Sequence, residues 1–334
     1  MYTHGKGAGC LIVGVYVDDL IITGGDVGAV NSFKAQMMST FCMSNLGLLS
    51  YYLGLEVTQG AAGITLRQSA YAAKILEKAG LAECNASATP MEPKLKLFKD
   101  GMMLSMDATE YRSLIGSLRY LCNSRLDLAY LVGYLSRFME APRQEHLAAV
   151  KCVLHYVAST LHWGLHYHPS KKNGGAPKLL GYSDSDLVGD VNDRKSTSGL
   201  IFFLAGGPIA WQSAKQKVVA LSSCEAEYIA AAVATCEAVW LAWLLAKLIE
   251  GAVLAPKLKV DNKSAIALMK NPMHHDRSKH IDVKFHFTRE CWDRKLIDVK
   301  FVGTKLQLGD ILMKALGRSR FQELRGGIGM KKLV

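Results

Sequence analysis

The chain has 334 residues, of which 50% are apolar and 21% charged, so we expect a folded protein of two or three domains and not a disordered tail. Its net charge of +11 favours polyanionic partners, of which nucleic acid is the commonest, although an anionic membrane would be attracted too. The 8 cysteines contain no Cys-x-x-Cys pair, which argues against a zinc ribbon or a disulfide framework. We therefore expect an intracellular protein that is not secreted.

The first hundred residues predict small alternating elements. Two β-branched runs flank an acidic tip within residues 9–23, which is typical of a β-hairpin. Apolar residues then recur at helical spacing over 27–43. Strands are expected at 49–58 and 64–68, a helix at 69–79, and a Pro-containing linker at 89–94.

The middle of the chain predicts helices and then a boundary. The pattern is helical from 108 to 159, and a short strand is expected at 163–168. The polar, Gly-containing stretch 171–177 marks the clearest domain boundary. Beyond it, the apolar window 228–249 is long enough to span a bilayer, but it contains Glu237 and Lys247. We expect buried helix there, and no membrane partner.

The last part of the chain has a different order of elements. Three strands close in sequence are predicted at 179–184, 198–205 and 209–213, and a long helix from 223 past 248. A strand at 258–261, helices at 264–270 and 276–294, a strand at 296–302, and helices from 307 and 318 follow. Three antiparallel strands, a helix and then strand–helix–strand–helix is the order of an α/β (α+β) protein with a ribonuclease H-like mixed five-stranded sheet.

Four acids fall at strand ends and helix starts of this last part: Asp184, Glu227, Asp261 and Asp310. Such positions can converge on one edge of a sheet, and clustered carboxylates bind hard cations, Mg²⁺ with Mn²⁺ as the alternative. Two ions about 4 Å apart would hold the attacking water and the leaving oxygen of a phosphodiester. Taken one at a time, each acid is more often a surface residue, so spacing by itself leaves the site a hypothesis.

Ordered motifs run through the chain. Those of the last part are Gly181–Asp186, Asp193–Gly199, Trp211–Gln216, Ser222–Tyr228, Asp261–Ile266, Ser278–Asp282 and Gln307–Ile311. They resemble the ribonuclease H domain of copia-type LTR retrotransposon Pol polyproteins. Upstream, Tyr16–Asp19 resembles the polymerase Y-x-D-D box of that family, Tyr51–Glu56 its strand near the primer end, and Tyr111–Leu121 its following helical region.

The resemblance implies three regions and a metal site. We expect a truncated reverse transcriptase palm end and thumb-like region in 1–98, a helical connection in 99–170, and the ribonuclease H-like domain in 171–334. The family's metal-binding and catalytic acids fall on Asp184, Glu227, Asp261 and Asp310, with Glu225 and Asp186 as neighbours that are not ligands. The family usually has other residues at five positions, which here are Leu126, Leu187, Cys224, Gly309 and Met313.

Further expectations concern the polymerase box and the nucleic acid. The residues before Asp18 supply no further acid for two-metal nucleotide transfer, so we expect Asp18 and Asp19 to be a relic polymerase site. Five side chains are expected to contact an RNA–DNA hybrid: Lys215, Lys217, Lys279, His280 and Lys284. The cytoplasm, in a virus-like particle, is the expected location, with the nucleus as the alternative.

The sequence thus favours a retrotransposon-derived ribonuclease H that hydrolyses the RNA strand of RNA–DNA hybrids with Mg²⁺, attached to an incomplete reverse transcriptase that does not polymerise alone. The first alternative is an inactive remnant that retains nucleic-acid binding. A DNA-cutting nuclease of the same sheet topology, as in integrases, is a further alternative, and four acids in place of three argue against it.

Overall fold

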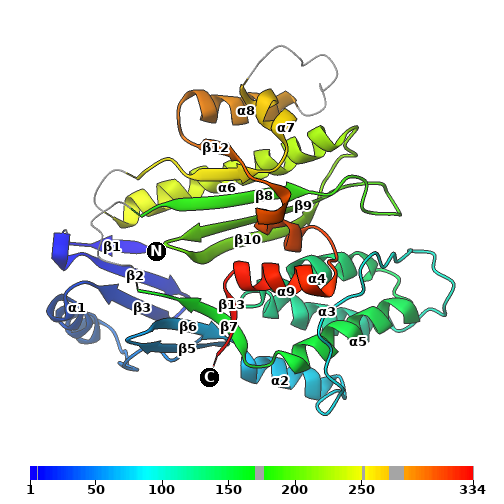
Figure 1. Ribbon diagram of the computed structural model, residues 1–334. Coiled ribbons are helices and arrows are strands. Elements are labelled where there is room, and N and C mark those ends of the chain that lie inside the picture. The colour runs from blue at the N-terminus through cyan, green and yellow to red at the C-terminus, as the bar shows by residue number, and fades with distance from the viewer. Residues whose placement is uncertain (6, 170–176, 250–252, 271–281, 334) are drawn as a thin grey trace.

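The computed structural model describes residues 1–5, 7–169, 177–249, 253–270 and 282–333. Within these residues the strands form three sheets, one of three strands and two of five (Figure 1). The three-stranded sheet has the order β1-β2-β3, all antiparallel, and consists of β1 (Tyr2–His4), β2 (Leu11–Tyr16) and β3 (Asp19–Gly24). Strands β2 and β3 are the predicted hairpin, and α1 (Val27–Thr40) follows as expected.

The second sheet joins the two ends of the chain. Its order is β13-β7-β6-β5-β4, and each neighbouring pair is antiparallel. The strands are β4 (Tyr51–Tyr52), β5 (Leu55–Gly60), β6 (Gly63–Arg67), β7 (Trp163–Tyr167) and β13 (Met330–Lys332). Strand β13 was not predicted from the sequence. Its three residues are too few for their apolar pattern to distinguish a strand from an irregular chain end.

The predicted helices of the middle region pack into one core. They are α2 (Ser69–Lys78), α3 (Ala108–Leu121), α4 (Ala129–Leu135) and α5 (Gln144–Ser159), with 3₁₀ turns η2 (Leu126–Leu128) and η3 (Ser136–Phe138) between them. A further 3₁₀ turn, η1 (Gly7–Gly9), precedes β2. The same core also receives α9 (Arg318–Gly327), whose Phe321 and Leu324 are buried in it. The end of the chain therefore packs on the middle region.

The third sheet has the order β10-β9-β8-β11-β12. Its strands are β8 (Leu179–Ser185), β9 (Thr197–Leu204), β10 (Gly207–Lys215), β11 (Lys257–Val260) and β12 (Asp298–Phe301). Strands β8, β9 and β10 are antiparallel, whereas β11 is parallel to both β8 and β12. This is the mixed five-stranded, ribonuclease H-like sheet that the element order predicts.

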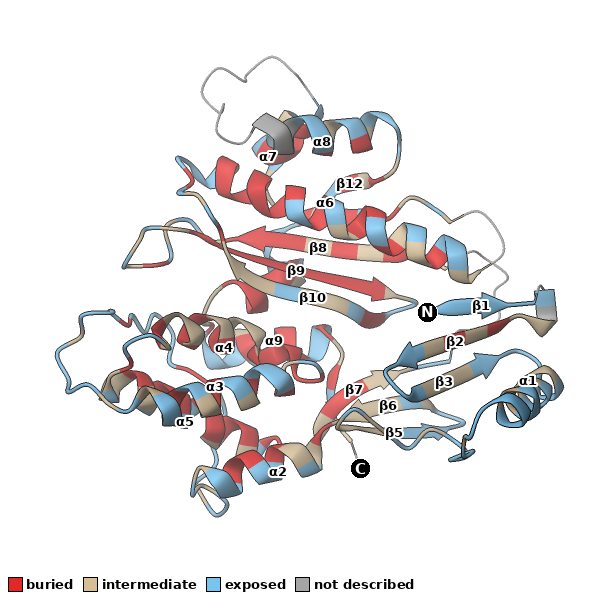
Figure 2. Ribbon diagram, turned by 180° about the vertical axis from the view of Figure 1, so that it is seen from behind, coloured by how far each residue is buried: buried red, intermediate tan, exposed pale blue. Residues whose placement is uncertain are grey.

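Both faces of this sheet are covered. Along β9, Leu200 and Phe202 belong to the core under α6 (Ser223–Leu248), whereas Ile201 and Phe203 belong to the core of the middle region. Successive residues of a strand point to opposite faces, so β9 is buried on both sides, as the red strand in Figure 2 shows. The helices α7 (Lys263–Lys270) and α8 (Asp282–Asp293) complete the layer with α6.

Helix α6 is the apolar window that was predicted as buried helix. It is long and apolar enough to cross a membrane, and 56% of its most apolar window is buried inside the protein. Because it packs on β8, β9, α7 and α8, its apolar character is explained as that of a core helix.

One prediction about the secondary structure is corrected by the structure, and one lies outside the described residues. The helix expected from residue 307 is not α-helical, because η5 (Thr304–Leu306) and η6 (Leu308–Leu312) are short 3₁₀ turns. Segment η6 lies against β8 and β9 and is tied there by Gln307, whose amide donates to the Ser183 carbonyl at 2.8 Å. The predicted linker 171–177 lies almost wholly outside the described residues, and the boundaries 1–98, 99–170 and 171–334 stay predictions.

Candidate active site

Strand register brings the first two acids together. Val260 of β11 pairs with Ser183 of β8 in a parallel ladder. The next residues of the two strands are Asp261 and Asp184, so adjacent strands present equivalent positions at the same edge of the sheet. Sequence alone placed both acids at strand ends, but only the register makes them neighbours.

The third acid comes from the start of α6. Ser222 caps this helix by accepting a hydrogen bond from the Glu225 backbone N–H at 3.2 Å, and the Glu225 carboxylate in turn accepts from the Leu221 N–H at 3.1 Å. This arrangement fixes the first turn of α6, and Glu227 reaches back to β8 from the turn that follows. The Ser185 backbone N–H donates to Glu227 Oε1 at 3.1 Å.

Removal of this cap gives a first test of the local structure. We expect Ser222→Ala to lower the free energy of unfolding by about 1 kcal/mol, because an N–H of the first turn loses its acceptor. Urea unfolding checks this value. Ser223→Ala, one residue into the helix, is the matched control, and an equal loss in both variants would contradict a capping role for Ser222.

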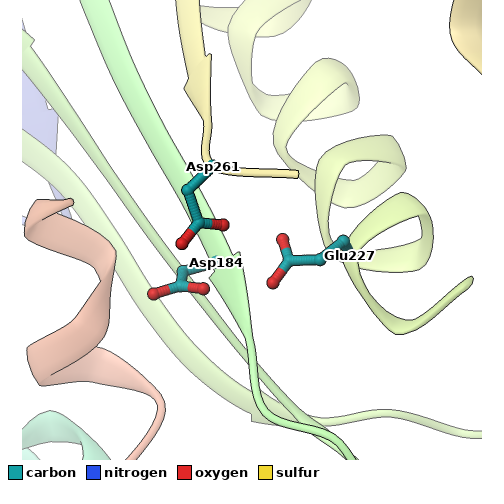
Figure 3. Close-up of side chains that lie close together, drawn as sticks. All are labelled: Asp184, Glu227 and Asp261. Atoms are coloured by element: carbon teal, nitrogen blue, oxygen red, sulfur yellow. The ribbon is translucent and has the colours of Figure 1, made fainter. Parts of the chain in front are cut away.

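One carboxylate oxygen from each of Asp184, Glu227 and Asp261 lies within 4.8 Å of the other two (Figure 3). Asp184 is 2% exposed and Glu227 6%, so these are carboxylates taken out of water. Asp184 Oδ2 and Glu227 Oε2 are buried without a hydrogen-bond partner. Buried polar atoms normally have a partner, so two orphaned oxygens at one point indicate that a ligand completes the site.

The proton affinities of these acids reflect their crowding. Burial, together with the negative charges of Glu227, Asp261 and Asp310, raises the pKa of Asp184 to about 10. Burial and the charge of Asp261 raise the pKa of Glu227 to about 7. The pKa of Asp261 is raised as well, first by burial, against the opposing hydrogen bond from Thr304. Like charges in a low-dielectric site cannot all ionise without a counter-charge.

This donor set fits a divalent cation. It contains carboxylate oxygens only, which is the ligand class of Mg²⁺ and Mn²⁺, and a bound cation would offset the repulsion that raises the three pKa values. Cysteine and histidine, the preferred ligands of zinc, do not belong to the three-residue group.

Asp310, the fourth predicted acid, lies beside this group and outside it. It is 3% exposed, and Gly309 before it packs so closely that an added Cβ would lie 2.8 Å from the Asp184 Cβ. Lys314 Nζ lies 2.5 Å from its Oδ1, and Arg320 Nη2 lies 3.3 Å from its Oδ2. Two cationic side chains therefore hold the carboxylate of Asp310, and its role as a metal ligand stays a prediction.

The two neighbouring acids have structural partners. Asp186 accepts a hydrogen bond from the Thr197 backbone N–H at 2.5 Å, where β8 and β9 diverge. Burial raises the pKa of Asp186 to about 6. The Glu225 carboxylate accepts a hydrogen bond from the Leu221 backbone N–H, as described above. Both carboxylates therefore have hydrogen-bond partners within the protein, and the expectation that neither is a metal ligand stays a prediction.

The basic residues predicted to contact substrate have different surroundings. Lys215 Nζ lies between Asp190 Oδ2 at 3.0 Å and Asp193 Oδ2 at 2.8 Å, which counts against its assignment to phosphate binding. Lys217 is exposed. Lys279 and His280 lie outside the described residues, and so does the side chain of Lys284. Substrate contacts of this group stay a prediction.

The relic polymerase residues lie in another sheet. Asp18 occupies the turn between β2 and β3, Asp19 is the first residue of β3, and both are exposed. The Y-x-D-D box therefore lies at the exposed turn of the β2–β3 hairpin. The assignment of Asp18 and Asp19 as a relic polymerase site stays a prediction.

Sequence reasoning missed four residues that shape the site: Thr304, Gln307, Lys314 and Arg320. Thr304 Oγ1 donates to Asp261 Oδ2 at 3.3 Å, and Gln307 ties η6 to β8. Lys314 was identifiable as the basic residue four positions after Asp310, a spacing at which helical side chains meet. No sequence signal would have indicated Arg320, because its position depends on how α9 packs.

Comparison with known proteins agrees with this architecture. Residues 1–93 match the family model of reverse transcriptase (RNA-dependent DNA polymerase). The chain is 37% identical over 328 residues, 98% of its length, to the retrovirus-related Pol polyprotein from transposon RE1 of Arabidopsis thaliana. It is 36% identical over 96% of its length to that from transposon TNT 1-94 of Nicotiana tabacum. A transposon Ty5-1 protein of Saccharomyces cerevisiae is 33% identical over 69% of the chain and 75% of its own length.

The chain belongs to the family of copia-type retrotransposon Pol polyproteins. This confirms the family that the motifs suggested, over nearly the whole chain. The Pol segment spans only 22% of the RE1 polyprotein and 24% of the TNT 1-94 polyprotein.

Proposed function

We propose that this Pol segment hydrolyses the RNA strand of RNA–DNA hybrids at the edge where β8, β11 and α6 meet. The observation that carries the proposal is the group of Asp184, Glu227 and Asp261, whose oxygens lie within 4.8 Å of one another and include two buried, unpartnered atoms. The mixed-sheet order and membership of the Pol family support a nucleic-acid enzyme of this class.

The residues present would hold divalent cations on these three carboxylates, with Asp310 as a further ligand. Such ions, when bound, activate water and stabilise the leaving 3′-oxygen of a phosphodiester. Around them the protein orients the ligands: the Ser185 N–H holds Glu227 Oε1, and Thr304 holds Asp261 Oδ2. Because the pKa values of these acids are raised, cation binding near neutral pH should release protons.

Substrate binding is proposed to depend on positive charge. The net charge of +11 attracts phosphates, and the exposed Lys217 follows the end of β10 by two residues. We expect the affinity for a hybrid to fall as salt rises, because each neutralised phosphate releases counterions. Preference for the RNA strand requires recognition of the 2′-hydroxyl.

The test compares a labelled RNA–DNA hybrid, duplex DNA and duplex RNA in Mg²⁺. We expect cleavage of the RNA in the hybrid alone, and its loss to the buffer background with EDTA or in Asp184→Asn and Glu227→Gln. The exposed Glu290→Gln on α8 is the control and should cleave as the wild type does. Salt-dependent binding without cleavage would instead support an inactive remnant, and cleavage of duplex DNA a DNA-cutting nuclease.

A further inference from the structure

Asp310 is held by two cations that differ in their freedom. Lys314 Nζ contacts Oδ1 at 2.5 Å with a side chain that is 42% exposed. Arg320 Nη2 contacts Oδ2 at 3.3 Å with a side chain that is 25% exposed. The two residues come from different elements, since Lys314 directly follows η6 and Arg320 lies on α9. The two side chains therefore carry the same charge next to Asp310, but the Arg320 side chain is more buried than that of Lys314.

Arg320 is restrained by several acceptors at once. Its Nη2 donates to the Thr304 carbonyl at 2.9 Å, and its Nη1 donates to the Lys305 carbonyl at 2.8 Å and to Glu323 at 3.0 Å. The Thr304 hydroxyl in turn donates to Asp261. The Arg320 guanidinium thus contacts Asp310 directly and contacts Asp261 indirectly, through Thr304. Both acids are in this way linked to helix α9. A planar fork with fixed donors suits this task, whereas an ammonium does not.

The helix that carries Arg320 is firmly anchored. Arg325 on α9 is 9% exposed, donates to the Tyr156 hydroxyl at 3.0 Å and lies 3.8 Å over the Trp163 ring. Phe321 and Leu324 are buried in the core of the middle region. The base of the Arg320 side chain is therefore fixed by contacts outside the third sheet.

Lys314 has the opposite character. Its described contact is the ion pair with Asp310, and its long side chain is half in solvent. Its positive charge also lowers the pKa values of Asp186, Glu227 and Asp261, so it acts on two members of the acid cluster as well as on Asp310. A partly exposed ammonium at this place supplies positive charge next to the crowded carboxylates.

We propose that Arg320 is a positioning residue for Asp310 and for the Thr304–Asp261 corner, whereas Lys314 is a placeholder cation that leaves Asp310 when a divalent ion binds. The inference rests on the proposed function, because it assumes that this cluster binds such ions. If Arg320 has this role, helix α9 belongs to the active site, and the middle region supports the site by holding α9 in place. The two roles predict opposite effects on metal affinity.

The experiment measures Mn²⁺ binding to the full chain by paramagnetic resonance, which needs neither substrate nor turnover. Loss of a positive charge next to a cation site should by itself strengthen binding. We expect Lys314→Gln to strengthen it severalfold. Arg320→Gln should instead weaken it about tenfold or more, the usual size for loss of a partner that orients a ligand.

Two further variants separate position from charge. Arg320→Lys keeps the charge without the fork, and we expect it to bind Mn²⁺ nearly as weakly as Arg320→Gln. Arg318→Gln removes a charge from an exposed site on the same helix and should leave binding unchanged. Thermal unfolding of each variant shows that the fold is retained.

The outcomes distinguish this inference from the proposed function. If the wild type binds Mn²⁺ and cleaves the hybrid, but Arg320→Gln binds as tightly as Lys314→Gln or Arg320→Lys restores full affinity, the positioning role is overturned and the nuclease stands. If the wild type neither binds Mn²⁺ nor cleaves, both are overturned. Opposite signs for the two glutamine variants support the proposal.

Discussion

In metal-free protein at pH 8, Asp184→Asn is expected to raise the free energy of unfolding by about 3 kcal/mol, although the same change abolishes the proposed cleavage. The reason is the cost of a buried carboxylate among like charges. Its pKa is raised to about 10, so the folded protein either keeps a proton on Asp184 or accepts the repulsion. Asparagine has nearly the same shape and carries no charge.

The sign of this effect depends on pH. A carboxyl whose pKa is higher in the folded than in the unfolded state stabilises the fold at low pH, and this contribution is lost as pH rises from about 4 towards 10. The gain from Asp184→Asn should therefore be small at pH 5 and larger at pH 7 and pH 9. Urea unfolding at the three pH values in EDTA measures it. Saturating Mg²⁺ should stabilise the wild type and reduce the gain.

Asp190→Asn is the matched control, because Asp190 is equally buried in the same part of the chain. Burial would raise the pKa of Asp190, but the Asn192 N–H, Lys215 and Arg137 together lower it well below its usual range. Its ionised form thus stabilises the fold above the pKa of the unfolded state, and this contribution is lost as pH falls. We expect Asp190→Asn to destabilise at pH 8. Equal signs for the two variants would contradict this account.

The second large effect concerns a buried ion pair of the middle region. Asp127→Ala is expected to lower the free energy of unfolding by about 3–5 kcal/mol, since removal of one partner leaves a buried charge uncompensated. Arg125 is 2% exposed and donates to both Asp127 oxygens, at 2.9 and 2.8 Å, and the Tyr156 hydroxyl donates at 2.7 Å. Urea unfolding near pH 7 measures the loss.

A surface pair provides the comparison for that variant. Arg294 and Glu290 form an ion pair on α8 with side chains that are 66% and 61% exposed. Glu290→Ala should leave the unfolding curve almost unchanged, because exposed pairs contribute little. If Asp127→Ala lowered the free energy of unfolding by less than about 1 kcal/mol, the buried pair of Arg125 and Asp127 would not have the stabilising role described here.

Local sequence patterns predicted most elements and three of the site positions. Two β-branched runs gave the hairpin β2–β3, and helical spacing gave α2, α5 and α6 within a few residues. Asp184, Glu227 and Asp261 were singled out because they stand at strand ends and a helix start, and the resemblance to the Pol family then implied that they bind metal. The misread segment, η6, is too short for its periodicity to distinguish a 3₁₀ turn from an α-helix.

The order of most elements, the family and the acids that could act together were therefore readable from the residues alone. Folding was needed to show that Val260 pairs with Ser183, that Lys215 forms ion pairs with Asp190 and Asp193, and that Arg320 contacts Asp310 and Thr304. The difference lies in the distance along the chain over which each effect acts. Propensity and periodicity act over a few residues along the chain, whereas register, ion pairing and the docking of α9 depend on packing between segments far apart in sequence.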